Sequence, residues 1–274
     1  MTLQRLLGDT PASAFLESHY LKLPYARPGG CAGLAALGSW EVVERVLTQP
    51  GVDVLVGRGG TQRPGTPSPE EARRLVAEGW TVGIRQAHRH DAGLAELVAG
   101  FACELRAVAD VHLYCTPANQ PGFGWHYDPE EVFVLQTQGA KEWHLRKNTV
   151  HPWPLMEAIP TDQRFEREIM PVMRCELHAG DWLYVPGGWW HRTQARDVES
   201  ISLSVGLVAS TALDVLDALR PQLRESLQWR QRIPPADSDE AVRRCREVFA
   251  ELGRDLAQRL ASEEFVREFL KRNS

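Results

Sequence analysis

The chain of 274 residues is long enough for one large domain, or for one domain with an appendage. Its hydrophobic fraction of 43% and charged fraction of 24% are those of an ordinary globular protein. The net charge of -5 leaves no basic excess to release counterions, which argues against a general nucleic-acid binder.

Five cysteines are scattered along the chain without a C-x-x-C pair, which predicts free thiols in a reducing compartment rather than a disulfide framework. The N-terminus shows no charged segment followed by an apolar run, and no apolar stretch of about 18 residues occurs. We therefore expect a cytoplasmic protein without a membrane span.

Helical and strand-like patterns alternate in the N-terminal part. The best-defined helix start is Ser68-Pro69-Glu70-Glu71, which combines a capping serine, a proline at the first helical position and an acidic first turn. The expected helices cover residues 10–16, 39–48, 68–78 and 91–108. The expected strands cover residues 21–25, 52–56 and 80–85, with a Gly/Pro-rich loop over 57–67.

From Val111 the pattern changes to short strands separated by Gly, Pro and Asn. Such a run favours an antiparallel barrel or jelly roll. The expected strands cover residues 111–116, 125–128, 132–136, 142–145, 174–177, 182–185 and 200–205. The predicted fold class is therefore mainly β with flanking helices, in one domain over residues 1–208.

Residues 209–274 are predicted to be a C-terminal helical segment. Leucines from Leu213 onward make an apolar stripe that Pro221 is expected to kink or break. A long helix follows, opened by Asp237 and Glu240 at the spacing of a capping box. Because a segment this short makes a poor independent core, it should pack either on the barrel or on a second copy of the chain, as a homodimer.

A pattern typical of metal ligands lies in the strand-rich part. His126 and Asp128 are separated by one residue, and His191 follows the turn Pro186-Gly187-Gly188. Side chains two residues apart on a strand point to the same side. The turn would lay the next strand antiparallel and carry His191 to the same end of the barrel. Two imidazoles and one carboxylate on one face of a metal are the ligand set of non-haem iron(II) oxygenases.

Two further clusters bear on this assignment. The competing group His88-Arg89-His90-Asp91 lies at a helix start, where Asp91 is better explained as an N-cap, so we assign no metal to it. Of the adjacent Trp189 and Trp190, only one can point inward from a strand. The other is expected outside the barrel or at the substrate mouth.

Two stretches of the sequence resemble a known family. The first contains Gly122-Phe123-Gly124-Trp125-His126-Tyr127-Asp128, then Val132-Phe133-Val134-Leu135-Gln136 and Lys141. The second is Gly180-Asp181-Trp182-Leu183-Tyr184-Val185-Pro186-Gly187-Gly188 and continues to His191. Together they resemble the central blocks of JmjC-type cupin oxygenases, most closely the group that includes the ribosomal protein hydroxylases. The likeness covers about residues 10–208.

The resemblance implies a double-stranded β-helix that holds Fe(II) and uses 2-oxoglutarate and dioxygen as co-substrates. It implies that His126, Asp128 and His191 are the metal ligands and the catalytic centre. Lys141 matches the basic residue that pairs with the distal carboxylate of 2-oxoglutarate. This role is physically reasonable, because a buried dicarboxylate needs a cation.

Three more residues are expected at the co-substrate. Tyr114 and Thr116 fall on the same side of their strand as His112, and all three can offer hydrogen-bonding groups to one ligand. His112 stands where the related ribosomal hydroxylases often carry Asn. An imidazole can also donate a hydrogen bond.

The sequence therefore predicts a dioxygenase that hydroxylates a C–H bond of a protein or peptide side chain. One alternative is a hydroxylase of a free amino acid or another small metabolite, and a second is a demethylase, since hydroxylating an N-methyl carbon uses the same chemistry. A third is a cupin that binds metal or ligand without turnover. The complete ligand set together with Lys141 argues against the third.

Overall fold

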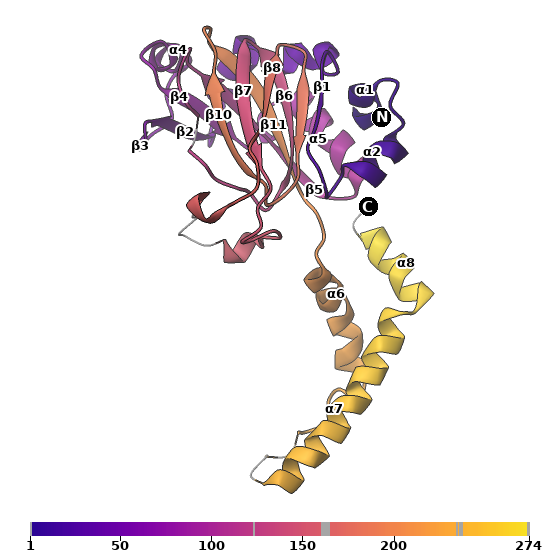
Figure 1. The fold of residues 1–274 in the computed structure, drawn as a ribbon. Coiled ribbons are helices and arrows are strands. Elements are labelled where there is room, and N and C mark those ends of the chain that lie inside the picture. Colours follow the sequence, from indigo (N-terminus) through magenta and orange to yellow (C-terminus); the bar gives the residue numbers. More distant parts are fainter. Residues whose placement is uncertain (1, 123, 160–164, 234, 236–237, 273–274) are drawn as a thin grey trace. The chain divides into compact units, whose positions relative to one another are not determined.

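The computed structural model describes residues 2–122, 124–159, 165–233, 235 and 238–272. Within it the chain divides between Ala209 and Ser210 into two compact units. Figure 1 shows the first unit as sheets with helices beside them, and the second unit as helices only, coloured orange to yellow.

Two antiparallel sheets make up the centre of the first unit. The larger has the strand order β1-β9-β6-β11-β5-β4-β2-β3, and the smaller has the order β10-β7-β8. The strands are β1 (Tyr25–Arg27), β2 (Asp53–Arg58), β3 (Thr61–Arg63), β4 (Thr81–Arg85), β5 (Val108–Thr116), β6 (Glu131–Gln138), β7 (Ala140–Arg146), β8 (Met173–His178), β9 (Trp182–Val185), β10 (Trp190–Ala195) and β11 (Ser200–Val208). From β6 onward the chain passes repeatedly between the two sheets, which confirms the predicted double-stranded β-helix.

Helices cover one face of the larger sheet. They are α1 (Thr2–Leu7), α2 (Ala12–Ser18), α3 (Trp40–Leu47), α4 (Pro69–Ala77) and α5 (Ala92–Leu105), with short 3-10 turns η1 (Ala32–Gly38) and η2 (Ala87–Arg89). Two more 3-10 turns, η3 (Met156–Ala158) and η4 (Phe165–Arg167), lie in the connection between β7 and β8. Leu6 of α1, Phe15 of α2 and Phe101 of α5 are fully buried in one apolar cluster with Phe133 of β6. This cluster is the main core of the unit.

Residue alternation decides which face of the sheet becomes the core and which becomes the site. In β11, Ile201 and Leu203 point into the helix-covered core, while Ser202 and Ser204 line a pocket between the two sheets. Tyr114 of β5 faces the same pocket. The sheet therefore has an apolar outer face and a partly polar inner face.

Three expectations about secondary structure were wrong. The strand expected over 21–25 begins only at Tyr25, and Leu21 before it has a positive φ of 62°. The loop expected over 57–67 contains β3, which forms a hairpin with β2. The segment 125–128 is no regular strand and makes only an isolated bridge between His126 and His191. In each case a turn or a partner distant in sequence decides the backbone conformation. The local pattern of apolar and polar residues does not reveal such contacts.

The second unit consists of α6 (Ala212–Glu225), α7 (Asp239–Leu260) and α8 (Glu263–Arg272). Thr211 and Asp214 form a capping box at the start of α6, and Pro221 lies inside that helix rather than ending it. Ser238 caps α7 by accepting a hydrogen bond from the Ala241 N–H, whereas Asp237, expected in this role, lies outside the described residues. Within the described part of the chain, no helix combines the length and apolar character needed to cross a membrane.

Candidate metal centre

The loop between β5 and β6 and the start of β10 meet at one end of the barrel. The His126 N–H donates to the His191 carbonyl at 3.1 Å, and the His191 N–H donates to the His126 carbonyl at 2.8 Å. The Gly188 N–H donates to the Asp128 carbonyl at 2.7 Å. The backbone thus joins the two sequence motifs directly, so that their side chains converge.

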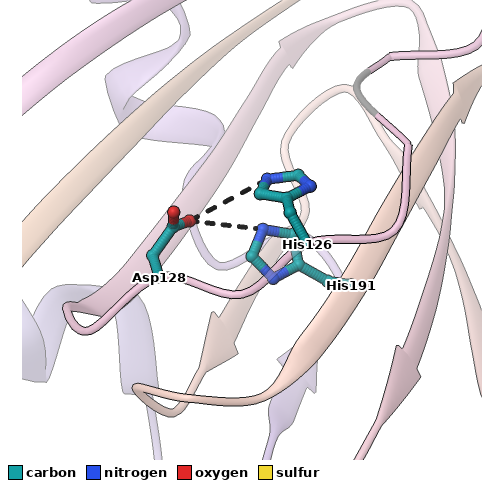
Figure 2. Close-up of side chains that lie close together, drawn as sticks. All are labelled: His126, Asp128 and His191. Atoms are coloured by element: carbon teal, nitrogen blue, oxygen red, sulfur yellow. Dashed lines mark ion pairs between the residues drawn. The ribbon is translucent and has the colours of Figure 1, made fainter. Parts of the chain in front are cut away.

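The side chains of His126, Asp128 and His191 lie on one side of this junction (Figure 2). One ligand atom from each lies within 4.8 Å of the other two. The Asp128 Oδ2 atom is 3.4 Å from His191 Nε2 and 4.0 Å from His126 Nε2. These separations allow a single cation to contact all three groups.

The hydrogen bonds of the two Nδ1 atoms show which tautomer each histidine ring adopts. His126 Nδ1 donates to the Gly124 carbonyl at 2.7 Å, and His191 Nδ1 donates to the Trp189 carbonyl at 3.0 Å. A carbonyl oxygen can only accept, so both Nδ1 atoms carry hydrogen and the neutral rings present an Nε2 lone pair. Two lone pairs and a carboxylate then face one point, and either a proton or a metal cation must balance them.

The protonation states suit metal binding. Burial, with His191 close by, lowers the pKa of His126 to about 4. Burial raises the pKa of Asp128, but the closeness of the His191 and His126 imidazoles outweighs it and leaves this pKa at about 2. Metal ligation requires neutral imidazole and ionised carboxylate, and both forms are available near pH 7.

A pocket of about 80 Å³ opens beside these three residues, between the sheets. It is lined by Thr81, Tyr114, Thr116, Gly122, His126, Asp128, Val132, Val134, Lys141, Trp143, His191, Thr193, Ser202 and Ser204. This volume holds several water-sized groups, because a single water needs only about 10–15 Å³. The pocket therefore suits a small polar ligand next to the metal position.

Lys141 is the cation of this pocket. Its side chain is 4% exposed, and Nζ donates to Ser202 Oγ at 3.0 Å. Burial lowers the pKa of Lys141 to about 8, so the ammonium form still predominates at pH 7. Among the described residues no carboxylate forms an ion pair with it. A buried charge without a partner is costly, which fits a site for an anionic ligand.

The other residues expected at the co-substrate divide into two groups. Tyr114 and Thr116 line the pocket with Lys141. His112 does not belong to the described lining, and its Nε2 atom lies 3.1 Å from Asp110 Oδ1. His112 is thus engaged with a neighbouring carboxylate.

The two adjacent tryptophans lie on opposite faces of the strand, as expected, but the one outside the barrel is covered rather than exposed. Trp189 and Trp190 are 8% and 1% exposed. Trp189 packs in the apolar cluster between the sheets, and the Trp190 ring meets Tyr127 at 4.8 Å on the opposite face. Both faces of the smaller sheet are therefore covered at this point.

Beyond Tyr114 and Thr116, sequence reasoning missed further hydroxyl groups of the pocket. Ser202 and Ser204 lie on β11, and Thr193 lies two residues after His191 on β10. The alternation Ser-Ile-Ser-Leu-Ser-Val at the start of β11 was the available signal, because it marks one polar face of a buried strand.

The paired sheets form a cupin-type barrel, and the convergent His, Asp and His side chains form a candidate metal site in it. Residues 85–215 match the family model described as the JmjC domain. The chain is therefore similar to JmjC proteins over this part of its length.

Its relatives are ribosomal oxygenases and related proteins. The chain is 28% identical over 180 residues to Ribosomal oxygenase 1 of Homo sapiens, covering 62% of this chain and 28% of that protein. It is 24% identical over 256 residues to the Bifunctional lysine-specific demethylase and histidyl-hydroxylase NO66 of Drosophila persimilis, covering 85% and 36%. The chain thus spans about a third or less of these relatives.

Solved structures support the fold. The structure of YcfD, a ribosomal oxygenase from Escherichia coli, in complex with cobalt and 2-oxoglutarate matches with a TM-score of 0.58 at 19% identity. The match covers 95% of this chain and 70% of that chain.

Proposed function

We propose that the chain is an Fe(II)- and 2-oxoglutarate-dependent dioxygenase that hydroxylates a C–H bond of a protein or peptide side chain. The observation that carries this proposal is a convergent His-Asp-His set beside a buried lysine in one small pocket. Among the described residues, no carboxylate pairs with this lysine. The donor set suits a divalent transition metal with open positions, and the lysine suits an anionic co-substrate.

The residues would divide the work as follows. His126, Asp128 and His191 would hold Fe(II). The Lys141 ammonium, oriented by Ser202, would bind the distal carboxylate of 2-oxoglutarate, with the hydroxyls of Tyr114 and Thr116 beside it.

The apolar part of the pocket wall also has a role. Val132, Val134 and Trp143 would exclude water from the reacting groups. When bound, iron with 2-oxoglutarate and dioxygen supplies the oxidation of a C–H bond to an alcohol, with release of succinate and carbon dioxide.

Two observations favour a polypeptide substrate over a free metabolite. The pocket of about 80 Å³ suits the co-substrate, so the substrate would approach from the mouth. The relatives carry names that describe action on proteins, namely ribosomal oxygenase and histidyl-hydroxylase. One of these names also includes lysine-specific demethylase, which keeps demethylation as the second candidate function.

The test is succinate release from 2-oxoglutarate by the full chain with Fe(II), compared with Asp128→Ala. We expect turnover with iron in the unaltered protein and none above background in the variant. Unchanged succinate release by Asp128→Ala would refute the site. Peptides from treated lysate should then gain the mass of one oxygen, whereas loss of a methylene mass would identify a demethylase.

We also propose that the chain forms a homodimer through α6, α7 and α8. This unit exposes large apolar side chains, including Leu213, Phe249 and Leu270, in a helical segment with little buried core. Light scattering should give a molar mass twice that of a single chain. The Phe249→Glu variant should have the mass of a single chain. A monomer at all concentrations would contradict this proposal.

A further inference from the structure

Each segment that carries a proposed ligand also carries an aromatic residue on its other face. Trp125 directly precedes His126, and Trp190 directly precedes His191. His191 lines the pocket, so strand alternation sends Trp190 to the opposite face of the smaller sheet. Trp190 is 1% exposed there, which means that other groups cover it.

Phe165, at the start of η4, contacts both of these tryptophans. Its ring stacks on Trp125 with centroids 4.0 Å apart and an interplanar angle of 8°. Its edge-on contact with Trp190 has a centroid distance of 5.6 Å and an angle of 81°. One side chain from a third segment thus touches the residue before each histidine.

The strand next to β10 holds Phe165 in place. The Arg146 guanidinium of β7 lies over the Phe165 ring at 4.4 Å from its centroid, and Arg146 also donates to the Glu168 carbonyl at 3.0 Å. The Glu168 carboxylate, 5% exposed, accepts from the Thr149 N–H at 2.6 Å and from the Thr149 hydroxyl at 2.8 Å. η4 is therefore tied at both ends to the end of β7.

The loop around His126 joins β10 by isolated bridges rather than by a continuous ladder. The bridges pair Pro121 with Gln194 and His126 with His191. The Arg192 guanidinium also lies over the Trp125 ring, at 5.2 Å from its centroid. A tilt of the loop between these contacts would move the Nε2 atom of His126 relative to Asp128 and His191. Stacking against a tethered ring opposes such a tilt.

We infer that Phe165 is a positioning residue for the metal centre, which acts through Trp125 and Trp190 to hold His126 and His191 at ligating separation. This inference rests on the proposed function, because it assumes that the three residues bind metal. Phe165 does not contact the pocket and has no part in the chemistry. Its loss should therefore weaken metal binding without removing a ligand.

The test uses Co(II) alone as the probe, added to the metal-free full chain and followed by visible absorption. We expect Phe165→Ala to raise the dissociation constant for Co(II) by about tenfold, as is typical when support around metal ligands is lost. Phe165→Tyr keeps the stacking ring and should restore the affinity. Trp153→Ala, in the same connection between β7 and β8 but 87% exposed, is the matched control and should leave affinity unchanged.

The inference is overturned if Phe165→Ala binds Co(II) as tightly as the unaltered chain, or if Phe165→Tyr binds as weakly as Phe165→Ala. If Phe165→Ala does not fold, Phe165→Leu is measured by the same criterion. Failure of the proposed function looks different. In that case the unaltered chain and Asp128→Ala would bind Co(II) equally well, whatever residue 165 is.

Discussion

His126 and His191 are hydrogen bonded to each other through their backbones, with each N–H donating to the other residue's carbonyl. The two histidines are far apart in sequence, and this pair forms an isolated bridge outside the regular ladders. Their ring separation, 4.2 Å between centroids, follows from this backbone contact. The geometry of the centre thus depends on how the loop that carries His126 meets the start of β10.

Lys141→Met should weaken 2-oxoglutarate binding without abolishing metal binding. The change removes a buried ammonium that donates to Ser202, while an unbranched apolar side chain keeps most of the volume. Hydrogen bonds to charged groups contribute about 1.5–3 kcal/mol, which corresponds to roughly a 10- to 100-fold rise in KM for the co-substrate. Lys147→Met, at an exposed lysine just beyond the end of the same strand, is the control. An unchanged KM in Lys141→Met would remove this residue from the site.

Affinity for 2-oxoglutarate should fall as pH rises above 8. Burial lowers the pKa of Lys141 to about 8, so the free protein loses the ammonium charge above this pH. Since each pH unit beyond the pKa lowers the protonated fraction tenfold, the dissociation constant should be about tenfold higher at pH 9 than at pH 7. Calorimetric titration of Co(II)-loaded protein measures this. A flat profile in the unaltered chain would contradict the assignment of Lys141.

The same pKa predicts the opposite trend for the stability of the ligand-free protein. Between pH 8 and the ordinary lysine pKa of 10.5, the unfolded chain binds more protons at this position than the folded chain does. The contribution of Lys141 to the free energy of unfolding therefore increases with pH across this window. The difference between the unaltered chain and Lys141→Met in urea unfolding should shift in favour of the unaltered chain from pH 8 to pH 10. A difference that stays constant would refute the lowered pKa.

Glu131→Ala should destabilise the fold near the metal centre. The Glu131 carboxylate, 6% exposed, accepts hydrogen bonds from the Gly187 N–H at 3.1 Å and from the Tyr184 hydroxyl. Removing it leaves two buried donors without an acceptor, which costs about 2–4 kcal/mol in the free energy of unfolding. Urea denaturation measures this cost, with the exposed Glu157→Ala as control. Equal midpoints for the two variants would contradict the role of Glu131.

Gly187→Ala should disturb the centre, whereas Gly124→Ala should not. A Cβ at Gly187 would lie 2.7 Å from the Pro129 carbonyl oxygen and 3.0 Å from Glu131 Oε1, so the loop after Asp128 would have to move. Overpacking of this kind costs about 1–3 kcal/mol, and Co(II) affinity should fall with it. A Cβ at Gly124 meets nothing within 4 Å. Equal Co(II) affinity in the two variants would contradict this account of the turn.

The sequence was sufficient to predict the barrel and the three convergent side chains. Strands show as periodic patterns of residues, and the turns between them show as Gly and Pro. Strand alternation marks β5 and β11, and a continuous apolar run marks β6. The Pro-Gly-Gly turn before His191 marks a reversal of the chain. The helix starts at Ser68 and Asp91 were also confirmed, since each side chain accepts a hydrogen bond from a backbone N–H three residues on.

What the sequence could not show depends on contacts between distant segments. The burial of both Trp189 and Trp190 requires covering groups on each face, and the Phe165 cover lies in a connection without periodicity. His112 was placed at the co-substrate by strand period and by the family resemblance, whereas in the structure it lies beside Asp110 and outside the described pocket lining. Strand alternation predicts the face of the sheet on which a side chain lies, but it does not predict which group on that face the side chain contacts.

The tryptophans beside the two histidines provide the protein with an internal optical reporter. Trp125 and Trp190 are each one peptide unit from a proposed ligand and share contact with one phenylalanine ring. Open-shell ions such as Co(II) quench indole fluorescence at short range. Emission from these two residues should therefore dim as the centre fills, so that occupancy can be read in the unlabelled chain.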